Sequence, residues 1–196
     1  LSEEDLLKAI LQDLGVISRN DDRLLARAPS KQDLINTLYD FLLSLVPLGA
    51  RAVLIIDEAQ NLPLRILEQI RILSNLETDK EKLLQIVLVG QRNLKDLLRS
   101  PELRQLDQRV SIRYELAPLN REETSAYIAH RLAIAGGGGA VSFAPGALDQ
   151  VHRYSGGIPR LINLLCDRAL LGGYSARTAR ITPQIVKSAA ATLELR

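Results

Sequence analysis

The sequence contains few of the residues that mark disulfide-rich or membrane-spanning chains. Its 196 residues include one cysteine, Cys166, which excludes an internal disulfide framework and favours a reducing compartment. No stretch approaches the roughly 18–20 consecutive apolar residues of a membrane-spanning helix. Aromatic residues make up 4% and tryptophan is absent, so the core must be aliphatic. Methionine is absent even at position 1, and the first residues are acidic, unlike a signal peptide. We therefore expect the sequence to be part of a longer polypeptide.

The charge of the chain is almost balanced. Lys and Arg number 25 against 23 Asp and Glu, which gives a net charge of +2, and the two signs are interspersed. This pattern argues against nucleic acid as the main partner. The hydrophobic share of 46% is enough for a core, and the length fits one large or two small domains.

Two short aliphatic runs indicate a buried parallel sheet. They are Ala52–Ile56 and Leu84–Val89, and continuous runs of this kind are typical of central strands covered on both faces. A third segment, Val110–Leu116, alternates apolar and polar residues, which predicts an edge strand. Amphipathic helical patterns precede and separate these segments, so the sequence predicts an α/β fold.

The chain divides near residue 118. Helical patterns with Ser2 and Ser30 as capping residues open the first part, and we expect residues 1–118 to form an α/β domain. After Pro118 only helical patterns remain, three of them with proline near the first turn, so residues 119–196 are predicted to be all-helical.

Two adjacent acids give the strongest chemical signal. Asp57 and Glu58 directly follow the first predicted strand, at the edge where α/β sheets bind ligands. An Asp at this place can hold a hydrated Mg²⁺ that bridges phosphate oxygens, and a neighbouring Glu can orient or deprotonate an attacking water. An acidic turn after a strand is also common without any such role.

Three further polar residues are weaker candidates. Gln91 follows the second strand, where an amide could contact a terminal phosphate or the attacking water, although a Gln in a turn after Gly90 is ordinary. Arg109 precedes the third predicted strand and could reach a phosphate in a neighbouring subunit, or it could be a solvated surface residue. Arg160 lies in a first helical turn, where a cation opposes the helix dipole and so points to an anionic partner.

Other sites are excluded by what the sequence does not contain. No glycine is followed by lysine, so the phosphate-binding pattern G-x-x-x-x-G-K-[ST] is missing. His130 and His152 have no Cys or His at a ligand spacing, which argues against zinc.

Taken in this order, the candidate residues resemble those of an AAA+ ATPase. Within the AAA+ ATPases, the motif sequences most resemble those of the general secretion pathway protein A family, the ExeA-like ATPases of type II secretion. The matching blocks span nearly the whole chain: Leu54–Leu62, Leu73–Thr78, Val89–Gln91, Leu103–Leu106 and Gly156–Asn163.

The resemblance implies a role for each candidate. Asp57 would coordinate Mg²⁺ and Glu58 would activate water for ATP hydrolysis. Gln91 would be sensor 1, Arg109 the finger offered to a neighbouring subunit of a homo-oligomer, and Arg160 the sensor 2 of a lid domain. Arg104 and Arg113 lie nearby and compete with Arg109 for the finger role.

The resemblance also implies an incomplete core. AAA+ sheets have the order 5-1-4-3-2, and the three predicted strands would be strands 3, 4 and 5. Strands 1 and 2 and the Walker A loop would precede Leu1. We therefore expect the chain alone to be poorly stable and inactive, with Val110–Leu116 about 10 Å, or two strand spacings, from Leu84–Val89.

Family members join a cytoplasmic ATPase domain, tethered to the bacterial inner membrane, to a peptidoglycan-binding part that this chain does not contain. With a membrane partner protein they assemble secretins through the cell wall. Two alternatives stay open: an AAA+ helper ATPase of DNA transposition, which would show a salt-dependent DNA affinity, and an interaction module that binds no nucleotide.

Overall fold

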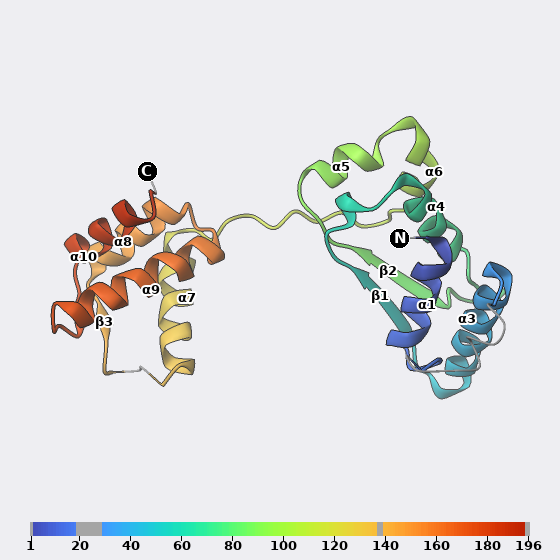
Figure 1. Cartoon of the computed structure of the whole chain (residues 1–196), viewed down its shortest axis with the longest axis horizontal. Helices are drawn as coiled ribbons and strands as arrows, with labels where there is room; N and C mark the ends of the chain where they lie inside the picture. Colours follow the sequence, from blue (N-terminus) through green and yellow to red (C-terminus); the bar gives the residue numbers. More distant parts are fainter. Residues whose placement is uncertain (1, 19–28, 137–138, 195–196) are drawn as a thin grey trace. The chain divides into compact units, whose positions relative to one another are not determined.

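The computed structural model describes residues 2–18, 29–136 and 139–194. Contacts divide the chain into two compact units, which are shown in Figure 1. Unit 1 is Leu1–Arg113 and unit 2 is Tyr114–Arg196. The sequence predicted a division near residue 118, whereas the two units divide between Arg113 and Tyr114. Each unit has its own hydrophobic core.

Unit 1 combines helices with a two-stranded parallel sheet. Its elements in chain order are α1 (Glu3–Asp13), α3 (Lys31–Leu45), η1 (Val46–Leu48), β1 (Ala52–Ile56), η2 (Ala59–Asn61), α4 (Leu64–Leu73), β2 (Leu84–Leu88), α5 (Asn93–Leu98), η3 (Pro101–Leu103) and α6 (Arg104–Asp107).

Helices α1 and α3 begin at capping boxes, as the sequence predicts. The Ser2 hydroxyl accepts a hydrogen bond of 3.0 Å from the amide of Asp5, whose carboxylate accepts one of 2.9 Å from the amide of Ser2. Ser30 and Asp33 repeat this arrangement before α3. These reciprocal bonds satisfy amides that the first helical turn leaves without partners.

The two aliphatic runs form β1 and β2, and they are parallel neighbours as predicted. The register pairs Ala52 with Leu84 and Ile56 with Leu88. Only one face of this sheet is covered by the described elements. On the other face the side chains of Val53 and Ile55 are 49% and 65% exposed, so the expectation of two buried faces is wrong for this chain.

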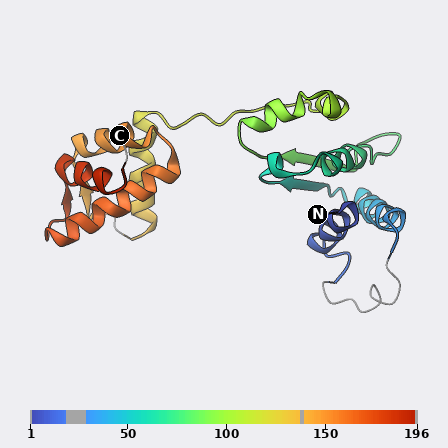
Figure 2. The same cartoon turned by 45° about the horizontal axis from the view of Figure 1, so that its top comes forward.

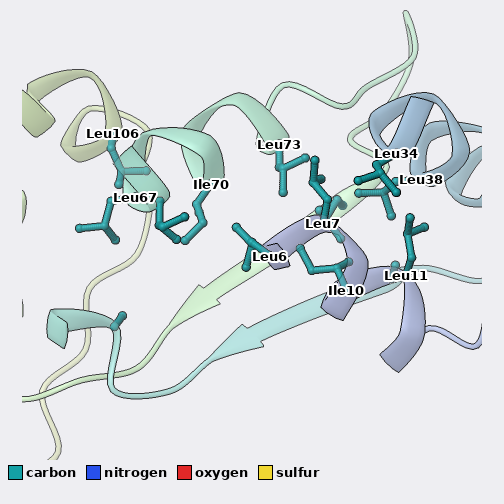
Figure 3. Packing of buried hydrophobic residues seen from close by; sticks show 14 of the residues in the cluster. Leu6, Leu7, Ile10, Leu11, Leu34, Leu38, Leu67, Ile70, Leu73 and Leu106 are labelled. Atoms are coloured by element: carbon teal, nitrogen blue, oxygen red, sulfur yellow. The ribbon is translucent and has the colours of Figure 1, made fainter. Parts of the chain in front are cut away.

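The core of unit 1 lies between the covered face of the sheet and the helices α1, α3 and α4. Figure 3 shows leucine and isoleucine side chains of these helices meeting above the two strands. The apolar residues recur at helical spacing, so one stripe of each helix faces inward. The fully buried members include Leu7, Leu11, Leu38, Leu67 and Leu73.

The predicted third strand is not formed. Val110–Leu116 has no regular secondary structure, and Ile112, Tyr114 and Leu116 are 83% to 86% exposed. A strand exists only where its backbone pairs with another strand. The AAA+ order would separate this segment from β2 by one further strand, and none of the described segments supplies that partner. As expected from that order, the segment does not pair with β2.

Unit 2 is mainly helical (Figures 1 and 2). It contains α7 (Arg121–Ile134), β3 (Ser142–Phe143), α8 (Pro145–Ser155), α9 (Pro159–Ser175), β4 (Arg180–Ile181) and α10 (Pro183–Thr192). The strands β3 and β4, two residues each, pair in parallel and were not predicted. Across the described ranges of both units, no helix is long and apolar enough to cross a membrane.

Gly157 allows the segment that precedes α7 to pack closely against the turn between α8 and α9. The amide of Leu119 donates a hydrogen bond of 2.9 Å to the carbonyl of Gly157, at the turn between α8 and α9. Gly157 has a φ of 75°, and a Cβ there would lie 1.9 Å from the carbonyl oxygen of Leu119. Its neighbour Gly156 has a φ of 57° but open space around the Cβ position.

Gly157→Ala is therefore expected to destabilise unit 2 by more than about 2 kcal/mol, because the substitution adds a steric clash with backbone to an unfavourable φ. Gly156→Ala is the matched control and should cost only about 1 kcal/mol, from its φ alone. Chemical denaturation monitored by circular dichroism measures both. Equal costs for the two variants would show that the contact with Leu119 does not restrict this position.

Candidate active site

The chain leaves β1 in a turn that is fixed to the end of β2. The amide of Val89 donates to the carbonyl of Ile56 at 2.8 Å, and the amide of Ala59 donates to the carbonyl of Val89 at 2.9 Å. Asp57 and Glu58 lie between these bonds, so their backbone is held at the carboxyl edge of the sheet. Both side chains are exposed.

Glu58 has an unusual backbone conformation. Its φ of 51° and ψ of 35° lie in the left-handed region, which non-glycine residues rarely adopt. The amide of Glu58 donates a hydrogen bond of 2.8 Å to Oδ1 of Asp57, which favours this conformation locally. Such strain persists where surrounding bonds fix the chain, and it is often found at functional sites.

Three side-chain amides approach the carboxylate of Glu58. Its Oε2 accepts hydrogen bonds from Nε2 of Gln60 at 2.5 Å, from Nδ2 of Asn61 at 3.4 Å and from Nε2 of Gln91 at 3.4 Å. Gln91 follows β2, whereas Glu58 follows β1. The pairing of the strands therefore brings together two residues that are far apart in the sequence and were both predicted as site residues.

The donor set suits a hydrated magnesium ion. Carboxylate oxygens are the protein ligands that Mg²⁺ prefers, and Mg²⁺ usually keeps several waters while it is held by one or two carboxylates and by phosphates. Asp57 and Glu58 are two exposed carboxylates at one strand end. Within the residues that the structure describes, no cluster of three or more His, Cys, Asp or Glu could hold a metal ion by itself.

Three arginines lie near the end of unit 1: Arg104, Arg109 and Arg113. They differ in whether their side chains make hydrogen bonds or ion pairs. The guanidinium of Arg113 donates to the carboxylate of Asp107 at 2.8 Å. The exposed side chains of Arg104 and Arg109 make no hydrogen bond or ion pair with any described residue. The pKa of Glu77 is lowered mainly by its hydrogen bond from Lys82, and Arg109 contributes a smaller attraction.

Arg160 belongs to unit 2 and lies in the first turn of α9. Its side chain is exposed and has no hydrogen-bond partner in the described part of the chain. Pro159 begins the helix, as expected, and a cation in this turn is not stabilised by the helix dipole.

Sequence reasoning did not identify Gln60. Its side chain contacts both Glu58 and the backbone of Gln91, because Oε1 accepts a hydrogen bond of 3.1 Å from the Gln91 amide. No periodicity or motif rule singles out the second residue after an acid, since this contact depends on the left-handed conformation of Glu58. Its position within the block Leu54–Leu62 was the one available signal.

Comparison with known proteins identifies the family. The AAA domain family matches residues 2–98. General secretion pathway protein A of Aeromonas hydrophila is 45% identical over 181 residues, which cover 92% of this chain and 32% of that protein. The chain is an AAA+ protein of the general secretion pathway protein A family. It spans about a third of the length of this relative.

Solved structures support the AAA+ fold. The RuvB Holliday junction branch migration motor of Thermotoga maritima aligns with a TM-score of 0.58 and 21% identity, over 79% of this chain and 49% of that one. The ADP form of the Aeropyrum pernix ORC2 protein aligns over 96% of this chain and 49% of that one, with a TM-score of 0.66 and 14% identity. Cdc6p from Pyrobaculum aerophilum covers 93% of this chain and 48% of its own, with a TM-score of 0.62 and 18% identity. At these identities the likeness concerns the fold alone.

The left-handed conformation of Glu58 in this AAA+ chain can be tested through stability. Glu58→Gly and Glu58→Ala both remove the carboxylate, but only glycine adopts a φ of 51° without strain. The glycine variant should be more stable than the alanine variant by about 1 kcal/mol. Parallel denaturant titrations measure this difference, and an alanine variant as stable as the glycine variant would contradict the strain.

Proposed function

We propose that this chain is the ATP-hydrolysing module of a secretion-system assembly protein. The observation that carries the proposal is the meeting of Glu58 with Gln91 at the carboxyl edge of β1 and β2, with Asp57 beside them. Ligands of open α/β sheets bind at this edge. The AAA domain match and the secretion relative support the same assignment.

The acidic turn provides the chemistry of hydrolysis in this proposal. Asp57 is the residue that would hold Mg²⁺, which when bound neutralises charge on the phosphate oxygens. Glu58 acts as the general base that orients the attacking water and accepts its proton. Gln91, held against Glu58, contacts the same water or the terminal phosphate through its amide.

In this proposal Arg109 and Arg160 supply positive charge from other parts of the molecule. Arg109 is exposed and its guanidinium has no hydrogen bond to a described residue, so it is free to reach the phosphate bound by a neighbouring subunit. Arg113 is a weaker candidate for this role because Asp107 already holds it. Arg160 contributes a cation from unit 2, as a sensor 2 residue would.

The biological setting is proposed on the basis of the relative. General secretion pathway protein A is the matched protein, which favours a secretion function over a DNA transposition helper or a nucleotide-free module. We propose a homo-oligomer at the cytoplasmic side of the bacterial inner membrane, working with a membrane partner protein. The chain has no G-x-x-x-x-G-K-[ST] sequence, so hydrolysis should require that loop from elsewhere in the full-length protein.

Substitution of Glu58 tests the catalytic proposal. In the full-length protein Glu58→Gln should slow ATP hydrolysis by at least ~10²-fold, the usual contribution of a general base, while ATP binding stays nearly intact. Asp57→Asn should instead weaken Mg²⁺-dependent ATP binding. Steady-state hydrolysis and isothermal titration with ATP and Mg²⁺ separate the two effects. Hydrolysis at the wild-type rate by Glu58→Gln would show that the assignment is wrong.

Mixing of variants tests the proposal that Arg109 acts between subunits. Arg109→Ala subunits keep an intact acid site, and Glu58→Gln subunits keep an intact arginine, so their heteromers should regain part of the activity that each variant lacks. Mass photometry can establish that mixed oligomers form, and hydrolysis is measured against mixing ratio.

The control for this experiment replaces Glu58→Gln with the double variant Glu58→Gln, Arg109→Ala, which has no arginine to offer and should give no recovery. Arg104→Ala is tested in the same mixtures. If Arg104 and not Arg109 is the finger, it is the Arg104→Ala subunits that lose hydrolysis and regain it when mixed with Glu58→Gln subunits. If mixed oligomers form and no ratio restores activity, Arg109 does not act on a neighbouring subunit.

A further inference from the structure

The side chain of Gln60 connects the two strand ends that carry the candidate active site. Its Nε2 donates to the carboxylate of Glu58 at 2.5 Å, and its Oε1 accepts from the backbone amide of Gln91 at 3.1 Å. The two contacts use opposite ends of one planar amide. A side chain with a donor and an acceptor at this distance can make both bonds, whereas a carboxylate has no donor for Glu58.

The loop after β2 leaves room for this amide because Gly90 has no side chain. A Cβ at Gly90 would lie 2.5 Å from Oε1 of Gln60 and 2.9 Å from Cδ2 of Leu94. The φ of Gly90 is not in the left-handed range, so the position requires the missing side chain and not the conformational freedom of glycine. The Gln60 amide therefore packs directly on the backbone of the loop that carries Gln91.

The backbone that carries Gln60 is itself anchored. The preceding residue, Ala59, is fully buried and its amide is bonded to the carbonyl of Val89. Glu58, in contrast, has an exposed side chain whose rotamers are restricted mainly by the amides around it. Of these amides, Gln60 makes the shortest contact, at 2.5 Å against 3.4 Å for Asn61 and Gln91.

We infer that Gln60 is a positioning residue for hydrolysis: it holds the Glu58 carboxylate in one orientation and fixes the loop of Gln91 against it. The inference rests on the proposed function, because it assigns Glu58 as the base through which Gln60 acts. The orientation of a general base relative to its water determines how well it works, whereas nucleotide binding depends on other groups. Loss of Gln60 should therefore lower kcat and leave KM for ATP almost unchanged.

Two substitutions of Gln60 test the hydrogen bonds separately from the size of the side chain. In the full-length protein, Gln60→Ala should lower kcat by about 10- to 100-fold, by analogy with the loss found when residues that orient metal ligands are removed. Gln60→Glu keeps the size but loses the donor and places a second carboxylate beside Glu58, so its kcat should fall at least as far. Gln184→Glu, an exposed position in unit 2, is the matched control and should leave kcat unchanged.

Gly90→Ala tests the same contact without changing Gln60. The added methyl would displace the Gln60 amide from Glu58 and Gln91, and it would also contact the buried side chain of Leu94. We expect a lower kcat with an unchanged KM, and a melting temperature that falls only by the cost of moving Leu94. Gly172→Ala is the control, since its Cβ would meet only a side-chain methyl of Ile185, at 3.2 Å.

A double-mutant cycle decides whether Gln60 acts through Glu58. If it does, adding Gln60→Ala to Glu58→Gln should change the residual kcat less than twofold, because the group that Gln60 positions is already lost. A full additional loss in the double variant, or wild-type kcat in both Gln60→Ala and Gly90→Ala, overturns the inference while Glu58 keeps its role. Wild-type hydrolysis by Glu58→Gln overturns the proposed function and the inference with it.

Discussion

The parallel pairing of β1 with β2 is the constraint on which the candidate site depends. Parallel strands run in the same direction, so the residues that follow them emerge at one edge. The register that pairs Ile56 with Leu88 therefore places the acidic turn and the loop of Gln91 side by side. Two further backbone bonds, from Val89 to Ile56 and from Ala59 to Val89, continue the connection beyond the strands. A slip of one residue would reverse the faces of the strand and separate these groups.

The covered face of the sheet maintains that register. Leucine and isoleucine side chains of α1, α3 and α4 pack on it, and shifting either strand would expose them. This packing also stabilises a backbone conformation at Glu58 that is unfavourable on its own. The strained residue lies between two hydrogen bonds that are part of the extended ladder, so its conformation is imposed by its neighbours. The pairing of β1 with β2 therefore underlies both the packed core of unit 1 and the left-handed conformation of Glu58.

The sequence allows prediction of the features that depend on local residues. Aliphatic runs predict β1 and β2, and the Ser2 and Ser30 capping boxes predict two helix starts, because these signals lie within a few residues of each other. The proximity of Glu58 and Gln91 could also be anticipated from strand direction. The predicted strand over Val110–Leu116, which is not formed, could not be judged in this way, because alternation gives the pattern of a strand and not its partner. The role proposed for Gln60 could not be predicted from the sequence either, since its two contacts require the left-handed turn at Glu58 and the absence of a side chain at Gly90.

The polar and charged groups of the proposed site fall into two physical classes. Glu58 and Gln91 are held by short-range hydrogen bonds at a sheet edge, so their geometry is set before any ligand arrives. Arg109 and Arg160 are long exposed side chains without hydrogen bonds to described residues, and ordering them costs conformational entropy. A bound phosphate supplies the charge that compensates for this cost. In the proposed mechanism the acid and the amide therefore determine where the water reacts, and the arginines become ordered only when nucleotide is present.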